Sequence, residues 1–227
     1  MNDNNSNDEI LLIDKPKNMS SFGVVARVRR VLSTRVGKKV KVGHTGTLDP
    51  FATGLLVLLV GKGTKRAGEF LKLDKEYEAE LRLGYVSSTG DIEGEIRRGG
   101  EVGDLNRAEV EKVAKGFIGK IWQKVPVYSA VKINGRRAYD LARKGVFVEM
   151  PEREVTIYDL KILDFSDGVV KFWCKVSSGT YIRTLGEDIG MKLGVGGYLI
   201  GLRRLKVGGF DVKDAVGAEE FCEKMEN

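Results

Sequence analysis

The sequence predicts an α+β fold with a mixed, mainly antiparallel central sheet flanked by helices. Apolar residues alternate with charged ones from Tyr77 to Tyr85, a period of two that is typical of a half-buried strand. Residues 155–165 and 169–176 predict two more strands, and the Asp167-Gly168 pair between them indicates a hairpin turn. Strands and helices follow one another without a regular βαβ rhythm, which favours α+β over α/β.

The N-terminal elements follow from the same patterns. Residues 10–14 predict a short strand that ends at Lys15-Pro16, where proline interrupts regular pairing. Ser20 or Ser21 can cap the next helix. Four apolar residues at helical spacing define its buried face: Val24, Val25, Val28 and Leu32. The apolar run 55–60 predicts a buried strand.

Two further helices are predicted downstream. Asn106 and Glu109 fit a capping box. An apolar stripe follows this box and consists of Val110, Val113, Ala114, Phe117 and Ile118. Residues 178–180 end the second hairpin strand, and another apolar stripe then predicts a helix: Ile182, Leu185, Ile189 and Leu193. The first of these stripes is expected to be core, so we assign it no chemistry.

The charge balance favours a polyanionic partner. The formal net charge is +6, and nucleic acid is the commonest partner of a basic protein, although a solvated basic surface explains this excess equally well. One run of cations contains no acid: Arg27, Arg29, Arg30, Arg35, Lys38, Lys39 and Lys41. This run favours a phosphate-binding track over a merely solvated helix face.

Composition also excludes several classes of protein. With two cysteines and one histidine, a zinc site of Cys and His is close to excluded, and a reducing cytoplasmic setting is expected. Residues 1–9 lack the features of a signal peptide and predict a disordered tail, and no apolar segment is long enough to cross a membrane. The segment 61–65 contains glycines and lysines but lacks the phosphate-loop pattern.

The segment 43–56 concentrates the unusual features of the chain. It holds the single histidine, His44, three glycines, and Asp49 between Leu48 and Pro50. An apolar run follows directly, so a carboxylate is presented on a tight turn beside a buried strand. This layout suits an aspartate that meets a substrate, although an Asp-Pro turn that only shapes the backbone would explain Asp49 on its own.

Seven segments, in order along the chain, resemble the TruB-type pseudouridine synthases. They are Lys15-Pro16, residues 43–56, Lys75-Glu76-Tyr77, residues 89–94, residues 126–132, residues 178–183 and Leu202-Arg203-Arg204. The resemblance implies a pseudouridine synthase fold and the isomerisation of the T-loop uridine of tRNA (position 55) to pseudouridine. It also implies base flipping and an aspartate-dependent rearrangement of the glycosidic bond.

The resemblance assigns roles residue by residue. Asp49 would be the catalytic aspartate, and Arg183 would pair with it and hold it ionised. Tyr77 would stack on the target base, while Tyr181 and Leu202 would line the uracil pocket. His44 would fill the gap that the flipped uridine leaves in the RNA. No cofactor or metal is implied.

The resemblance also predicts the organisation of the chain. Residues 10–227 would form a single catalytic domain, and an insertion at about 128–150 would close over the RNA. Candidate contacts to the RNA backbone are Arg27, Arg30, Lys132, Arg136, Arg137 and Arg143. The chain ends about 25 residues after Leu202, so no C-terminal PUA domain is expected.

A stand-alone enzyme that reads the T-arm without a guide RNA is therefore expected, and a monomer is the default expectation. One alternative is a guide-RNA-dependent enzyme of the archaeal and eukaryotic (Cbf5-like) type. Another is a non-catalytic RNA-binding or RNA-folding protein. The presence of both Asp49 and Arg183 argues against the second alternative, because a binder has no need of a charged pair in its pocket.

Overall fold

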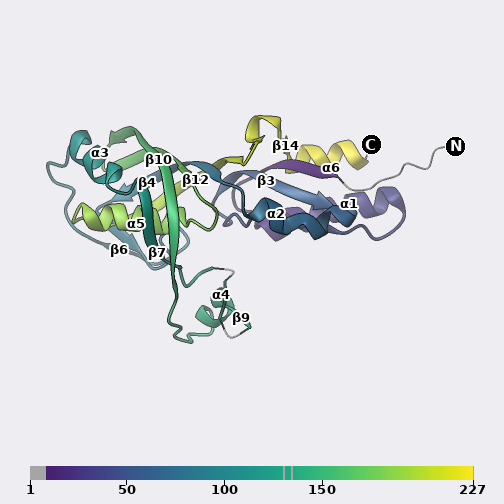
Figure 1. Cartoon of the computed structure of the whole chain (residues 1–227), viewed down its shortest axis with the longest axis horizontal. Helices are drawn as coiled ribbons and strands as arrows, with labels where there is room; N and C mark the ends of the chain where they lie inside the picture. The colour runs from purple at the N-terminus through teal and green to yellow at the C-terminus, as the bar shows by residue number, and fades with distance from the viewer. Residues whose placement is uncertain (1–8, 130, 134, 227) are drawn as a thin grey trace. The chain divides into compact units, whose positions relative to one another are not determined.

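The computed structural model describes residues 9–129, 131–133 and 135–226 (Figure 1). Residues 1–8 of the predicted tail lie outside this part of the chain, as do Ala130 and Asn134 of the predicted insertion. Contacts divide the chain into two compact units. The continuous unit is Glu78–Gly201, and the discontinuous unit combines the segment up to Tyr77 with the segment from Leu202 onward.

The discontinuous unit begins with a strand, a long helix and two more strands. Its elements are β1 (Ile10–Lys15), α1 (Ser21–Val36), β2 (Val42–His44), β3 (Thr53–Val60), η1 (Gly61–Arg66), α2 (Ala67–Leu71), the start of β4 (Lys75–Leu83), the end of β12 (Gly197–Val207), β13 (Phe210–Asp211), η2 (Val212–Asp214), β14 (Val216–Gly217) and α6 (Ala218–Glu226). The strands lie in the order β14-β1-β3-β12, with β2 also on β3 and β13 on β12. Strand β3 is antiparallel to β1 and parallel to β12, so this sheet is mixed as predicted.

Strand β3 is buried on both faces, which explains its uninterrupted apolar sequence. Successive side chains of a strand point to opposite faces of the sheet. Leu56 and Leu58 therefore pack on one face, in a core that α1 and α6 complete. Leu55, Val57 and Leu59 pack on the other face, together with α2. Figure 1 shows α6, in yellow, beside α1.

The continuous unit is built around antiparallel strands. Its elements are the rest of β4, β5 (Tyr85–Ser87), β6 (Ile96–Arg98), α3 (Arg107–Lys115), β7 (Gly119–Lys124), β8 (Lys132–Ile133), β9 (Arg136–Arg137), α4 (Ala138–Ala142), β10 (Glu152–Ser166), β11 (Val169–Val176), α5 (Ile182–Lys192) and the start of β12. The strand order is β12-β4-β11-β10-β7, and β10 is antiparallel to both β11 and β7. These pairings confirm the predicted fold class and the predicted hairpin.

Two sequence expectations were wrong in detail. Tyr85 does not continue the alternation of β4, because Gly84 adopts φ 83° and ends the strand, and Tyr85 is exposed in β5. The stripe of α3 extends only to Ala114, since the helix ends at Lys115 and Gly116 forms its C-cap. Phe117 and Ile118 therefore lie outside the helix, and the side chain of Ile118 is exposed.

Candidate active site

Asp49 lies on the loop between β2 and β3 of the discontinuous unit, and it is half-buried. The carbonyl of Asp49 accepts the Ala52 N–H at 3.1 Å, which closes a turn with Pro50 in the second position, where its fixed φ is favourable. The side chains of Leu48, Phe51 and Ala52 are buried. The backbone at Asp49 is thus held between buried apolar side chains.

Ser21, the first residue of α1, holds the loop through a single hydroxyl. Its Oγ accepts the Leu48 N–H at 2.8 Å and donates to the Leu48 carbonyl at 2.9 Å, and its side chain is buried. Both backbone polar groups of the residue before Asp49 are therefore satisfied by one oxygen atom. Ser20, the residue before it, has the ordinary capping role and accepts the Gly23 N–H at 3.0 Å.

Lys15 anchors the loop from the end of β1. It is fully buried, and its Nζ donates to the carbonyls of Pro16, Met19 and Pro50 at 2.9, 2.6 and 3.2 Å. The Pro50 carbonyl also accepts the Asn18 N–H at 2.9 Å. A buried ammonium is tolerated only when oxygen atoms replace its water, and here these atoms come from the backbone around Asp49. Lys15 therefore supports the loop structurally, through the backbone carbonyls that it binds.

Arg204 holds the other side of the loop from strand β12. Its guanidinium donates to the carbonyls of Leu55, Gly46 and Thr47 at 2.7, 3.1 and 3.4 Å, and only 2% of the residue is exposed. Gly54, paired with Arg204, has φ +99°, and a Cβ there would collide with the Arg204 carbonyl oxygen. Glycine is therefore required where the two strands meet.

Tyr77 is buried on β4, two residues after Lys75. Burial and, next, the charge of Arg204 lower the pKa of Lys75 to about 8, while Asp74 raises it. The Lys75 Nζ donates to the carbonyls of Leu71 and Leu73 at 2.8 and 2.5 Å. Lys75, like Lys15 and Arg204, thus uses its cation to bind backbone carbonyls.

Arg183 lies in the first turn of α5 in the continuous unit, with only 4% of the residue exposed. Its guanidinium donates to the carbonyls of Thr89 and Tyr128 at 2.8 and 2.9 Å, and it lies 3.5 Å from an Asp91 carboxylate oxygen. Asp91 also accepts the Thr89 hydroxyl at 2.6 Å and the Glu93 N–H at 2.9 Å. This buried network fixes the direction in which the Arg183 side chain extends.

Tyr181, the residue that caps α5, is fixed through its backbone by Gln123 of β7. The side-chain amide of Gln123 accepts the Tyr181 N–H at 3.0 Å and donates to the Tyr181 carbonyl at 3.2 Å. Gln123 itself is only 1% exposed. Glu187 lies one helical turn after Arg183. Burial raises the pKa of Glu187 to about 7, while the charge of Arg183 lowers it and the charges of Asp188 and Asp91 raise it.

The six predicted substrate-site residues are divided between the two units. His44, Asp49, Tyr77 and Leu202 belong to the discontinuous unit, whereas Tyr181 and Arg183 belong to the continuous unit. His44 is half-buried at the end of β2, and Leu202 is half-buried on β12. Sequence reasoning did not single out the supporting role of Ser21 or that of Gln123, since a polar residue at a helix start or on a strand carries no signal of burial.

The predicted RNA-contacting cations lie in two places. Arg27 and Arg30 are on α1, and the other four are in the insertion. There a cavity of about 500 Å³ is lined by Lys132, Gly135, Arg136, Arg137, Asp140, Leu141 and Lys144. Arg143 is not among these residues, but the guanidinium carbons of Arg137 and Arg143 lie 5.8 and 5.7 Å from the centre of the Tyr139 ring.

Among the described residues, no group of three or more His, Cys, Asp or Glu side chains is arranged to hold a metal ion. Within the same part of the chain, every helix is too short or too polar to span a membrane.

Comparison with known proteins identifies the family. The model for the N-terminal domain of the TruB family pseudouridylate synthases matches residues 29–182, and the model for the tRNA pseudouridylate synthase B C-terminal domain matches residues 183–227. The tRNA pseudouridine synthase B of Nitrosococcus oceani is 45% identical over 212 residues, which cover 93% of this chain and 67% of that protein. The protein of the same name from Phocaeicola vulgatus is 42% identical over 219 residues, 96% of this chain and 93% of that protein.

Among solved structures, the chain is similar to one from a Cbf5-Nop10-Gar1 complex, with a TM-score of 0.72 and 30% identity. That likeness covers 94% of this chain and 53% of the other. The two family models together span most of the sequence, including every residue of the predicted substrate site. The chain therefore belongs to the TruB family of pseudouridylate synthases.

Proposed function

We propose that this protein isomerises uridine to pseudouridine in the T-loop of tRNA. The reaction breaks the bond between uracil N1 and ribose C1′, turns the base, and joins C1′ to C5. The C5 proton leaves to solvent, and N1 gains a proton. Because a base inside an RNA stack cannot turn, the uridine has to be flipped out, at a cost of a few kcal/mol.

The observation that carries this proposal is the support of Asp49. Three buried polar side chains, Lys15, Ser21 and Arg204, donate to or accept from the backbone of its loop. A turn with a purely structural role has no need of two buried cations, whereas a reacting group has to be held in place. A carboxylate so placed can attack the sugar or remove a proton from it.

The other roles follow from the family and from the local geometry. Tyr77 supports the flipped base by stacking, which is worth roughly 1–3 kcal/mol per base. Tyr181 and Leu202 line the uracil pocket, and His44 fills the gap in the RNA. Arg183 is assigned to keeping the carboxylate of Asp49 ionised, since a nearby arginine opposes the rise in pKa that burial causes.

The cations supply contacts to the RNA backbone. Two of these cations lie on α1: Arg27 and Arg30. Four lie in the insertion: Lys132, Arg136, Arg137 and Arg143. Tyr139 adds an aromatic face to the insertion. It lies between Arg137 and Arg143 in sequence, and both guanidinium groups are within cation–π distance of its ring. Such a combination of cations and an aromatic ring is typical of surfaces that bind single-stranded RNA.

We also propose that the protein acts in the cytoplasm as a monomer, without a guide RNA or a metal ion. The curated relatives carry tRNA in their names, whereas the similar solved chain comes from a complex with other proteins. A guide-dependent enzyme is thus the second candidate. The purified chain, mixed with an unmodified tRNA transcript and no other RNA, distinguishes the two.

The deciding experiment maps pseudouridine in that transcript after incubation with the wild type or with Asp49→Asn. We expect one new pseudouridine in the T-loop with the wild type and none with the variant, while both bind the tRNA with similar affinity. A wild type that binds tRNA in a salt-sensitive manner but forms no pseudouridine would refute the stand-alone reaction. Equal activity of the two proteins would refute the role of Asp49.

A further inference from the structure

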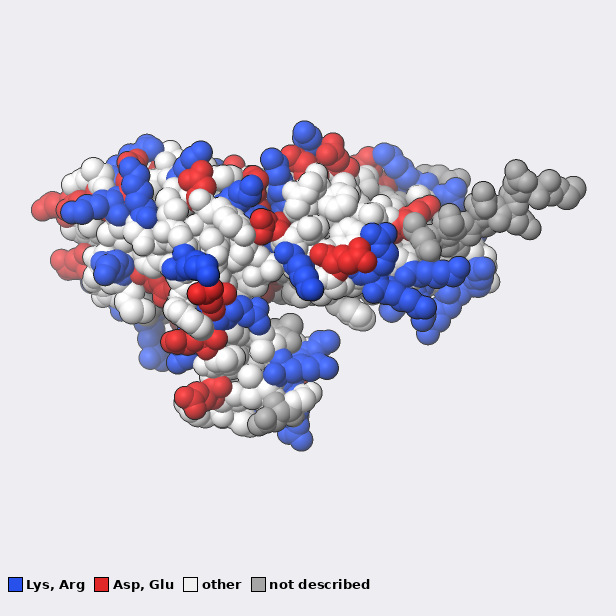
Figure 2. Space-filling model, viewed as in Figure 1, with Lys and Arg blue, Asp and Glu red and all other residues white. Residues whose placement is uncertain are grey.

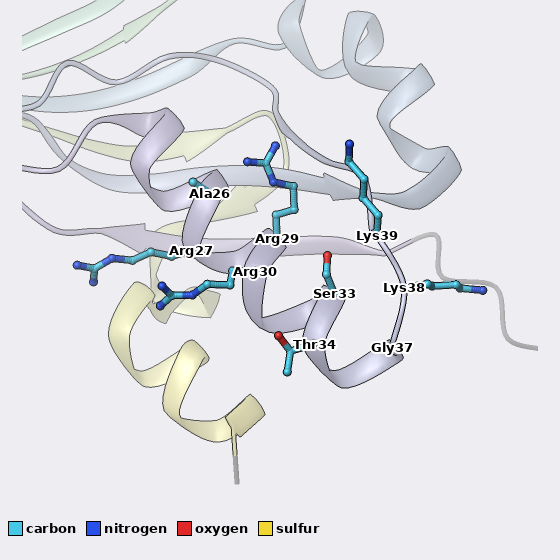
Figure 3. Close-up of a pocket in the computed structure, with 9 residues that line it drawn as sticks. All are labelled: Ala26, Arg27, Arg29, Arg30, Ser33, Thr34, Gly37, Lys38 and Lys39. Atoms are coloured by element: carbon cyan, nitrogen blue, oxygen red, sulfur yellow. The ribbon is translucent and has the colours of Figure 1, made fainter.

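A basic groove runs along α1, apart from the loop that carries Asp49. Its volume is about 830 Å³, and it is lined by Ala26, Arg27, Arg29, Arg30, Ser33, Thr34, Gly37, Lys38 and Lys39 (Figure 3). Five of these residues are cations and none is an acid. All of them belong to the discontinuous unit. Figure 2 shows Lys and Arg side chains gathered over the region of α1.

The groove is held in shape by hydrogen bonds of its own. Gly37 ends α1 in the left-handed conformation, with φ 68°, and its N–H donates to the Thr34 carbonyl. The Ser33 hydroxyl accepts the Val40 N–H at 3.0 Å, which ties the loop with Lys38 and Lys39 back to the helix. The charges of that loop are therefore presented from a fixed backbone.

An exposed aromatic ring lies next to the groove. The Arg29 guanidinium lies 5.8 Å from the centre of the Phe22 ring, and the side chain of Phe22 is 63% exposed. Phe22, Ala26, Arg29 and Ser33 are spaced by three or four residues, so they follow one face of the helix. An arginine that stacks on an exposed ring has its rotamers restricted, and it loses less entropy when it binds an anion.

The position of the groove separates it from the reaction. Ser21, which holds the Asp49 loop, stands at the start of α1, and the helix continues to Thr34 and beyond. At 1.5 Å per residue, the thirteen helical steps from Ser21 to Thr34 span about 20 Å. A group bound at the far end of the groove therefore lies about 20 Å along the helix from the residue that holds the Asp49 loop.

Helix stability alone does not explain these cations. Positive side chains favour the last turn of a helix, where the negative end of the dipole lies, and Arg35 occupies that turn. Arg27, Arg29 and Arg30 lie in the middle of the helix, where this effect has decayed. Of these three, Arg27 has an acidic neighbour, Glu219, at 3.6 Å on an exposed surface, where such a pair adds little stability.

We propose that this groove is a second docking site for tRNA, which binds backbone phosphates outside the hairpin that contains the target uridine. Successive helical turns present cations at intervals of about 5.4 Å, similar to the spacing of neighbouring phosphates along an RNA strand. The hydroxyls of Ser33 and Thr34 can donate to phosphate oxygens beside them. The proposal rests on the proposed function for the identity of the RNA.

The test compares a whole tRNA with its isolated T-arm hairpin. The variant combines Arg29→Gln, Lys38→Gln and Lys39→Gln. We expect KM for the whole tRNA to rise about tenfold or more, while kcat stays the same and KM for the hairpin changes less than twofold. The plot of log affinity against log salt concentration should become shallower by about 0.7–0.9 for each phosphate that the variant no longer binds.

A matched control removes the same charge elsewhere. Lys112→Gln, Lys115→Gln and Lys192→Gln change three exposed lysines on α3 and α5 of the continuous unit. This triple variant should retain the KM and the salt dependence of the wild type. A groove variant with wild-type KM on whole tRNA would overturn the proposal, and so would one that loses affinity for the hairpin equally.

Two additions keep the outcome separate from folding and from catalysis. The pair Lys38→Gln and Lys39→Gln leaves the stacking of Arg29 on Phe22 in place, so its loss of affinity cannot come from a disturbed helix. Anisotropy with Asp49→Asn as the parent protein measures tRNA binding without turnover. If the parent binds tRNA and the groove variant does not, the groove is established even when the wild type forms no pseudouridine.

Discussion

Ser21→Ala tests whether the start of α1 positions the catalytic loop. The change removes one oxygen atom that satisfies both the N–H and the carbonyl of Leu48 in the buried interior. Each unsatisfied buried group costs about 1–3 kcal/mol, so the loss of partners for two groups should lower the free energy of unfolding by about 2–6 kcal/mol. Because Leu48 directly precedes Asp49, the position of the carboxylate should also become less defined.

The matched control is the neighbouring Ser20→Ala. Ser20 caps the same helix but makes its side-chain bond to Gly23 rather than to the loop. This change should cost about 0.5–2 kcal/mol of stability and leave kcat unchanged. Ser21→Ala should lower kcat about 10- to 100-fold with little change in KM, because small misplacements of a reacting group have effects of this size.

Both numbers can be measured on the same preparations. Urea unfolding gives the stability, and release of tritium from C5-labelled uridine in tRNA gives the rate, since that hydrogen leaves when C5 joins the ribose. A Ser21→Ala enzyme that is less stable but keeps the wild-type kcat, like Ser20→Ala, would refute the idea that this hydroxyl positions Asp49.

Three further predictions concern other residues. Gln123→Leu removes both hydrogen bonds to the backbone of Tyr181. The kcat/KM on tRNA should fall at least tenfold, and an unchanged value would show that the Tyr181 backbone needs no such support. Gly54→Ala forces a Cβ against the Arg204 carbonyl at a positive φ; strain of about 1–3 kcal/mol plus the clash should prevent soluble expression or lower Tm sharply, and a wild-type Tm would contradict the close approach. Burial raises the pKa of Glu187 from 4.5 to about 7, so its ionisation disfavours folding and the cost appears as pH rises from about 4.5 through 7. Glu187→Gln should therefore stabilise the protein at pH 8 by about 1–2 kcal/mol, a value reduced for partial exposure. At pH 4 the change should have little effect on stability. An equal effect at both pH values in urea titrations would exclude the ionisation of Glu187 as the cause.

Local patterns predicted most of the regular structure. Ser20 caps α1, Asn106 and Glu109 form the capping box of α3, and the Asp167-Gly168 turn joins β10 to β11 with both residues at positive φ. These elements are determined by neighbours in sequence, which is why they can be recognised there. Tyr85 was misplaced because a glycine can either continue a strand or end it, and tertiary contacts decide which.

The site was predictable only in part. The unusual segment around Asp49 stood out from the sequence, because a lone histidine, an aspartate and three glycines precede a buried strand. The groups that hold it did not stand out in the same way. Lys15 and Arg204 are charged, and such residues are almost always exposed. Their burial depends on carbonyl groups that only the folded chain brings together.

The discontinuous unit has a consequence for the biosynthesis of the protein. Its core joins Ile13 and Val24 to Ala218 and Phe221, so about two hundred residues separate partners that touch. A ribosome releases the whole continuous unit before the closing helix α6 exists. Ile13, Leu56 and Leu58 can already cover part of the apolar face of α1, but the part that α6 covers stays exposed during that interval. Contacts between residues so far apart in sequence form slowly, and the surface left exposed is prone to aggregation. In a cell that makes this protein, the half that carries Asp49 should be the last to mature and the half that most needs a chaperone.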